Sequence, residues 1–79
     1  MFPVFEINIQ AIAKFSIDES SEGLRYVSTH VVESNKYIIY IAPKDDWLVL
    51  NVNFCESLIY YVVHYYVGMD EPIATPSIC

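Results

Sequence analysis

The sequence predicts an α+β fold in which four antiparallel strands form a meander and one C-terminal helix packs on one face of the sheet. The strands are predicted by an apolar alternation of period two over residues 5–16 and by runs of β-branched and aromatic residues over 24–32 and 37–42. The helix is predicted because residues 54–67 separate polar from apolar side chains better at a helical period than at a strand period. An all-β fold of five strands is the alternative.

The length and composition are those of one small domain. The chain has 79 residues, of which 54% are hydrophobic and 15% aromatic. A chain of this size buries only about 60–65% of the surface that its unfolded form exposes, so its core is marginal, but its apolar content is ample for folding. We expect a single compact domain over residues 1–71 and an extended C-terminal tail over residues 72–79, where Pro72 and Pro76 interrupt any periodicity.

Short polar segments separate the predicted strands. Residues 18–23 are mostly acidic or serine and end in glycine, which predicts a turn after the first strand. Residues 33–36 predict a hairpin loop between the second and third strands. Pro43 cannot donate a hydrogen bond to a strand ladder, so it begins a turn over residues 43–46.

The long segment from Trp47 to Val67 is predicted to change from strand to helix near Asn53. Its 21 residues are far too many for one strand, since strands usually have about 5–6 residues. Asn53 followed by Glu56 fits the pattern of a helix N-cap, and Gly68 lies where a helix C-terminus favours glycine. The content of valine, isoleucine and tyrosine favours a strand instead, which is the basis of the all-β alternative.

The predicted helix has a polar side and an apolar side. Cys55 lies on the apolar side, where a thiol behaves as a small hydrophobe, so we expect it to be buried and chemically inert. Because Cys55 and His64 lie on opposite sides of the helix, they cannot form one reactive or metal-binding site. The polar side is formed by Glu56, Ser57, Tyr60 and His64. The apolar side is formed by Phe54, Cys55, Leu58, Ile59, Val62, Tyr65 and Tyr66.

The charge balance indicates a basic partner. Ten acidic residues against four basic residues give the chain a net charge of −6. Nucleic-acid backbones and anionic membrane surfaces both attract Lys and Arg, so direct binding to either is not expected. An acidic surface raises the rate of association with basic proteins and selects for them.

The meander would collect most of the acidic residues at one end of the sheet. The turns over residues 18–23 and 43–46 share that end, and the helix returns the chain to it at residues 68–71. The loop with Glu33 lies at the opposite end. Solvated turns with no binding role are the alternative interpretation. The predicted acidic tip for partner binding is formed by Asp18, Glu19, Glu22, Asp45, Asp46, Asp70 and Glu71.

The sequence also holds more apolar and aromatic surface than one helix on one sheet face would bury. Large exposed apolar patches mark interaction sites, and tyrosine and tryptophan often dominate the energetics of interfaces. We therefore predict that the outer sheet face and the outer side of the helix bind another protein or a second copy of the chain. The residues concerned are Trp47, Tyr60, Val63, His64 and Val67.

The sequence contains no motif for catalysis, metal binding or cofactor binding. Cys-x-x-Cys and His-x-x-x-His spacings are absent, so no metal site is expected. With two glycines, the chain has no glycine-rich loop to hold a phosphate. We expect a protein that is not an enzyme and that binds no cofactor.

A cytoplasmic location is expected. Two cysteines make no disulfide framework, and Glu6 interrupts the apolar run that a signal peptide would need. The apolar block over residues 58–67 is shorter than the about 20 residues that span a membrane. A longer membrane span would include Asn51, Asn53 and Glu56, and an ionised residue inside a bilayer costs at least about 2.5–3.5 kcal/mol.

The sequence thus predicts a small acidic protein that docks on a basic, nucleic-acid-binding protein as an inhibitor or adaptor. In its general character the chain resembles small phage proteins that block host machinery, including anti-CRISPR proteins, and the resemblance implies action in the host cytoplasm. The alternative is a structural or assembly subunit that associates with itself, as a homodimer, with its acidic residues serving solubility alone.

Overall fold

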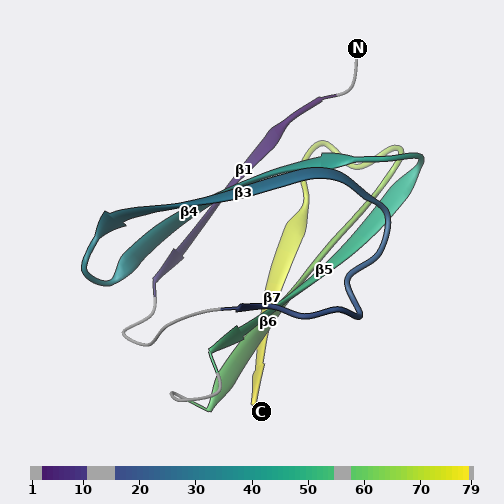
Figure 1. Ribbon diagram of the computed structural model, residues 1–79. Coiled ribbons are helices and arrows are strands. Elements are labelled where there is room, and N and C mark those ends of the chain that lie inside the picture. Colours follow the sequence, from purple (N-terminus) through teal and green to yellow (C-terminus); the bar gives the residue numbers. More distant parts are fainter. Residues whose placement is uncertain (1–2, 11–15, 55–57, 79) are drawn as a thin grey trace.

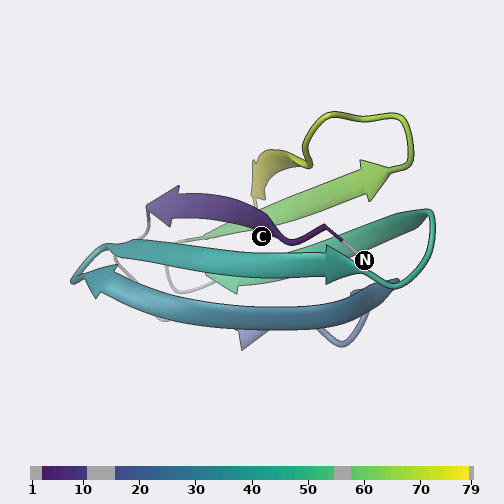
Figure 2. The same cartoon turned by 90° about the horizontal axis from the view of Figure 1, so that it is seen from above.

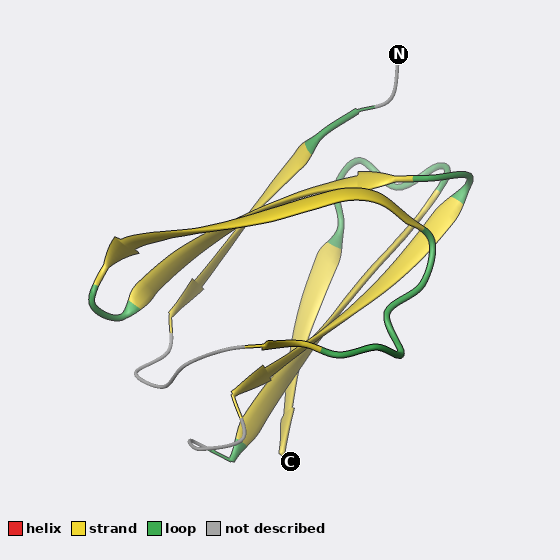
Figure 3. Ribbon diagram, viewed as in Figure 1, coloured by secondary structure: helices red, strands yellow, loops and turns green. Residues whose placement is uncertain are grey.

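The computed structural model describes residues 3–10, 16–54 and 58–78, and within them every regular element is a β-strand (Figure 1; Figure 3). The predicted α+β fold is therefore wrong. The all-β alternative has the right class but too few strands, because the described residues form seven. The strands are β1 (Phe5–Gln10), β2 (Ser16–Ile17), β3 (Leu24–Glu33), β4 (Lys36–Pro43), β5 (Trp47–Phe54), β6 (Ile59–Tyr66) and β7 (Ile73–Ile78).

The strands form two antiparallel sheets rather than one meander. The three-stranded sheet has the order β1-β4-β3, and the four-stranded sheet has the order β2-β5-β6-β7. Seen from above, β1, β4 and β3 lie side by side as one curved layer (Figure 2). The chain therefore moves to the second sheet after β1, returns for β3 and β4, and moves again at β5.

The core lies between the two sheets and follows from strand alternation. Along β5, every second side chain from Leu48 to Phe54 is fully buried, and the residues between them are partly exposed. The alternation predicted for the first strand is confirmed over its described part, where Ile7 and Ile9 are buried. Rings join the sheets, with the Phe5 and Tyr65 centroids 4.8 Å apart. The buried cluster comprises Ile7, Ile9, Ile39, Ile41, Leu48, Leu50, Val52, Phe54 and Val63.

The segment predicted as a helix contains strand β6. It pairs with β5 along its whole length, so that Leu50 lies opposite Val63. Asn53 belongs to β5 and is no helix cap, and the predicted cap partner Glu56 lies outside the described residues. The preference of valine, isoleucine and tyrosine for strands outweighs the helical pattern, because β5 offers a ladder that satisfies the backbone of β6. Leu58, with a left-handed φ of 60°, stands just before the strand begins.

Residues 73–78, expected within an extended tail, form β7 at the edge of the four-stranded sheet. Each residue of β7 has a partner on β6, from Ile73 opposite His64 to Ile78 opposite Ile59. Pro76 is tolerated there because an edge strand can hold a residue that donates no hydrogen bond. The prediction that Cys55 is buried lies outside the described residues.

Candidate functional site

An exposed apolar patch lies at one end of the four-stranded sheet, on the face away from the core. Alternation buries Leu48 and therefore turns Trp47 outward, and Trp47 pairs with Tyr66 across the sheet. Trp47 is 47% exposed and Tyr66 is 60% exposed, although both are large aromatic side chains. We call this group the aromatic end, and it consists of Trp47, Tyr66, Val67 and Ile73.

The predicted apolar contact residues divide between this outer face and the core. Trp47, Tyr60 and His64 share the outer face, because Tyr60 and His64 lie opposite the outward-facing side chains of β5. Val67 follows β6 directly and is exposed. Val63 is fully buried, so its assignment to a contact surface is wrong. The error follows from the helical wheel, which placed Val63 beside Tyr60, whereas strand alternation turns the two to opposite faces.

Two acidic loops meet at the aromatic end (Figure 1). The N–H of Val67 donates to the carbonyl oxygen of Asp46 at 2.6 Å, and the N–H of Lys44 donates to the carbonyl oxygen of Gly23 at 2.7 Å. A further acidic residue, Glu22, pairs with Val49 just beyond Trp47. We call these carboxylates the acidic rim, and they are Glu22, Asp45, Asp46, Asp70 and Glu71.

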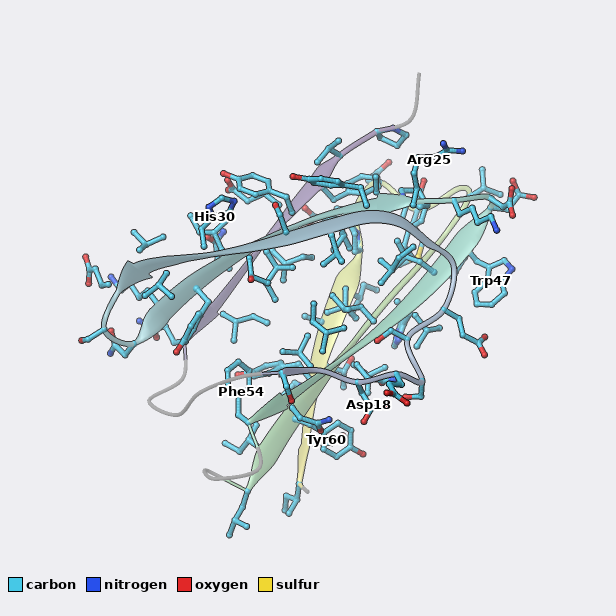
Figure 4. All side chains as sticks on the ribbon, in the orientation of Figure 1. Asp18, Arg25, His30, Trp47, Phe54 and Tyr60 are labelled. Carbon is cyan, nitrogen blue, oxygen red and sulfur yellow. The ribbon has the colours of Figure 1, made fainter. Side chains whose placement is uncertain are left out.

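Asp18 and Glu19, predicted in the same acidic tip, lie further along β5. The N–H of Asp18 donates to the carbonyl oxygen of Asn51 at 2.8 Å, in the half of β5 away from Trp47. Figure 4 likewise shows Asp18 near Tyr60 and away from Trp47. The predicted tip of seven residues is thus divided, because this segment runs antiparallel along β5 instead of forming a tight turn between neighbouring strands.

Side chains hold this segment onto β5. The Asn53 side chain donates from Nδ2 to Asp18 Oδ2 at 3.0 Å, and the Asn51 N–H donates to Ser21 Oγ at 2.9 Å. The N–H of Ser20 donates to Asp18 Oδ1 at 2.8 Å. This backbone hydrogen bond, followed by hydrogen bonds from the Ser20 and Asn53 side chains, lowers the pKa of Asp18 below 3.8. The segment therefore fixes Glu22 of the acidic rim beside the sheet.

Sequence reasoning missed Tyr66 and Ile73, and it missed a second basic residue at this end. Tyr66 was assigned to the apolar side of a helix and Ile73 to the tail, so neither was placed beside Trp47. Arg25 lies near the same end as Lys44, because Leu24 at the start of β3 pairs with Pro43 at the end of β4 (Figure 4). Strand alternation is the signal that could have found Tyr66. In a strand, a residue one position away from an inward-facing side chain points outward.

The exposed apolar side chains of the aromatic end, bordered by carboxylates, have the character of a binding surface. Among the described residues, no three His, Cys, Asp or Glu side chains are grouped as a metal site requires. None of the described segments forms a helix with the length and apolarity needed to cross a membrane. Comparison with protein-family models, curated proteins and solved structures gives no match to this chain.

Proposed function

We propose that the protein is a non-enzymatic binding module that docks on a basic protein through the aromatic end and the acidic rim. The supporting observation is that four large apolar side chains are exposed together and are bordered by five carboxylates from three segments of the chain. Interfaces commonly have such an anatomy, with a centre rich in aromatic residues and a polar rim.

The two parts of the surface have different roles. Trp47 supplies the central anchor, because a tryptophan that becomes desolvated on binding is among the strongest contributors to affinity. The acidic rim guides a positively charged surface toward that anchor and gives the association its salt dependence. Lys44 and Arg25 lie near the rim and would favour a partner that also carries isolated carboxylates.

The basic partner in this proposal is a nucleic-acid-binding protein, on which the chain acts as an inhibitor or adaptor in the manner of phage anti-defence proteins. The proposed location of the chain is the cytoplasm. The choice of partner is supported by the net charge of −6 and by the shortage of basic residues for direct contact with nucleic acid. The cytoplasmic location is supported by a content of two cysteines, which makes no disulfide framework. A protein that covers a basic nucleic-acid site needs only a complementary acidic surface with an apolar anchor.

A pull-down from native lysate at low and high salt, with four forms of the protein as bait, tests the proposal. We expect a basic protein to be retained by the wild type at low salt and to be lost with Trp47→Ala, by about thirtyfold in affinity. The double change Asp45→Asn and Asp46→Asn should weaken binding and flatten its salt dependence. Glu33→Gln removes a charge from the opposite end and should have no effect. Equal retention by all four forms would refute the proposed site.

A further inference from the structure

We propose that two copies of this chain pair through the free edges of β3, antiparallel and centred on Thr29, to form one six-stranded sheet. The inference goes beyond the proposed function, because it uses the three-stranded sheet and leaves the aromatic end free. Each copy would contribute β1, β4 and β3, with the two β3 strands in the middle.

The edge of β3 is the longest strand edge left open in the described part of the chain. β3 has ten residues, whereas the other long edge strands, β1 and β7, have six each. Proteins protect edges with short strands, prolines, charges and β-bulges. β7 carries Pro76, but β3 contains no proline, and its charged residues and its two irregularities in pairing lie only near its ends, at Arg25 and at residues 32–33. Its central backbone groups can therefore accept another strand.

Exposed apolar side chains accompany this open edge. Tyr26, Val31 and Val32 are 51%, 66% and 54% exposed. These residues lie on both faces of the strand, since Tyr26 and Val31 are an odd number of residues apart within the regular stretch 26–31 and neighbouring side chains alternate. A partner that covers both faces at the edge must therefore be a strand in the same sheet rather than a protein lying on one face.

Two-fold symmetry limits how two β3 strands can pair. The axis runs perpendicular to the sheet, so each residue must lie opposite a residue that points to the same face. A register centred between two residues would place neighbouring residues, which point to opposite faces, opposite each other. The two-fold axis must therefore pass through a single residue of β3. The central candidates are Ser28, Thr29 and His30.

Charge complementarity selects Thr29. Centred there, Arg25 of each copy lies beside Glu33 of the other, because the irregularities at Arg25 and Val32 bring these two charges to the same end of the paired strands. Glu33 also pairs with Lys36 of its own chain at 3.6 Å, and Arg25 adds a second positive charge there. A pairing centred on Ser28 places Arg25 opposite Val31. A pairing centred on His30 opposes two histidines and leaves Arg25 beyond the end of the paired strand.

The remaining pairs of this register are also favourable. Tyr26 lies opposite the irregularity at Val32, and Val27 lies opposite Val31. Tyr26, Val31 and Val32 are exposed in the single copy, and Val27 is half-buried. Thr29 lies opposite itself, and aromatic–β-branched and Thr–Thr pairs are among the favourable cross-strand combinations. The pairing of β3 with β4 is regular over residues 26–31 and irregular at both ends. The regular stretch thus includes the proposed centre.

Cysteine cross-linking gives the sharpest test of the register. Opposed residues of antiparallel strands have Cα atoms about 4.5–5.5 Å apart, which a disulfide can bridge. With both native cysteines replaced by serine, Thr29→Cys should form a covalent dimer on mild oxidation. Ser28→Cys is the control, because the two copies of that residue would be about 8 Å apart, beyond the reach of a disulfide. Equal cross-linking at both positions, or none at Thr29→Cys, would overturn the register.

Charge exchange tests the pairing in a protein that keeps its native cysteines. Sedimentation at micromolar concentration should show a dimer for the wild type. Arg25→Glu alone and Glu33→Arg alone should each weaken the dimer about tenfold, because two attractive pairs become repulsive. The double exchange should restore the dimer to nearly wild-type strength. A wild-type monomer, or a double variant as weak as the single ones, would refute the proposal.

The test also separates this inference from the proposed function. Trp47→Ala changes the aromatic end alone, so it should leave the dimer unchanged while it removes binding to a basic partner. Glu33→Arg, at the opposite end of the molecule from Trp47, should do the reverse. If Trp47→Ala abolished the dimer, the interface would be the aromatic end, and pairing through β3 would be wrong.

Discussion

The outer edge of β5 and the outer edge of β3 are treated differently by the rest of the chain. β5 is covered by β2 and by residues 18–22, which hydrogen-bond to it through backbone and side chains. We call this the covered edge. β3 has no covering segment within the described residues, and we call it the open edge.

The two edges also differ in the contacts that their polar side chains make. Asn51 and Asn53 on β5 bind Ser20 and Asp18, so the covered edge is held by specific side-chain contacts. The open edge carries valine, threonine and serine, which suit a strand that is paired on both sides. We infer that the covered edge serves the stability of the single chain and the open edge serves association. Substitutions at the two edges should therefore have different consequences.

The largest expected effect is at Gly23, where the covering segment ends. Gly23 has a φ of 76°, and an added Cβ would collide with the carbonyl oxygen of Trp47. Gly23→Ala should therefore reduce the free energy of unfolding by roughly 2–5 kcal/mol, from the left-handed backbone and the collision together. Urea denaturation measures the loss.

Gly68 provides the matched control for this substitution. It also has a positive φ, of 103°, but a Cβ added there meets no atom of the described chain within 4 Å. Gly68→Ala should cost only the backbone term, about 1–2 kcal/mol. If both variants lost the same stability, the contact between Gly23 and the first residue of β5 would have no energetic role.

The next effect is at Ser21, whose hydroxyl oxygen accepts the N–H of Asn51 on β5. Ser21→Ala leaves this partly buried N–H without its acceptor and should cost about 1–2 kcal/mol in unfolding free energy. Ser20→Ala is the control, because the Ser20 side chain is exposed and contacts only side chains, accepting an N–H of Asn51 and donating to Asp18. Its loss should be about 0.5 kcal/mol or less. A larger loss for Ser20→Ala would mean that side-chain contacts, and not the backbone of β5, secure the covered edge.

The edges also mark the limit of what the sequence could predict. The strands over residues 24–33 and 36–43 were predicted nearly to their ends, because β-branched residues and turn signals are local. The change of sheet after β1 was missed, because the alternation over residues 5–16 continues without a sign of it. The pairing of β1 with β4 depends on residues about 30 positions apart, which no local pattern records.

The strand β6 was missed for a specific reason. The helical pattern depended on Glu56 and Ser57, which precede the strand. Within β6, His64 is the one residue that is neither aliphatic nor tyrosine, so the strand itself shows no alternation of polar and apolar side chains. Of the aromatic end, Trp47 was predicted as a contact residue but Tyr66 was not. The outward direction of Tyr66 depends on its pairing with β5. Local patterns therefore predicted single residues of the site, and tertiary pairing decided which of them meet.

A smaller effect is expected at Asp18 and should depend on pH. Hydrogen bonds from Ser20 and Asn53 lower the pKa of Asp18 in the folded protein below 3.8. The stability that these bonds provide is therefore complete above about 3.8 and is lost as the pH falls through the lowered pKa. Asp18→Asn should be less stable than the wild type at neutral pH, and the difference should vanish in acid. Urea denaturation across this pH range measures it.

Glu71→Gln controls for net charge in that experiment, because it removes one negative charge from a different loop. If the Glu71→Gln and Asp18→Asn proteins changed together across the pH range, general repulsion among the acidic residues would explain both. The contact between Asp18 and Asn53 would then contribute nothing to the covered edge.

The smallest effect on the stability of the single chain is expected at the open edge, at Val31. This side chain is 66% exposed, so Val31→Lys should change the unfolding free energy of the monomer by no more than about 0.5 kcal/mol. The same substitution should abolish pairing, because a lysine would oppose Val27 at both ends of the proposed interface.

Association stabilises a folded protein by mass action, so the melting temperature of the wild type should rise with protein concentration. That of Val31→Lys should not, and at high dilution the two melting temperatures should converge. A wild-type melting temperature that is independent of concentration would show that the open edge serves no association. A Val31→Lys variant as unstable as Ser21→Ala would show that the open edge supports the single chain as the covered edge does.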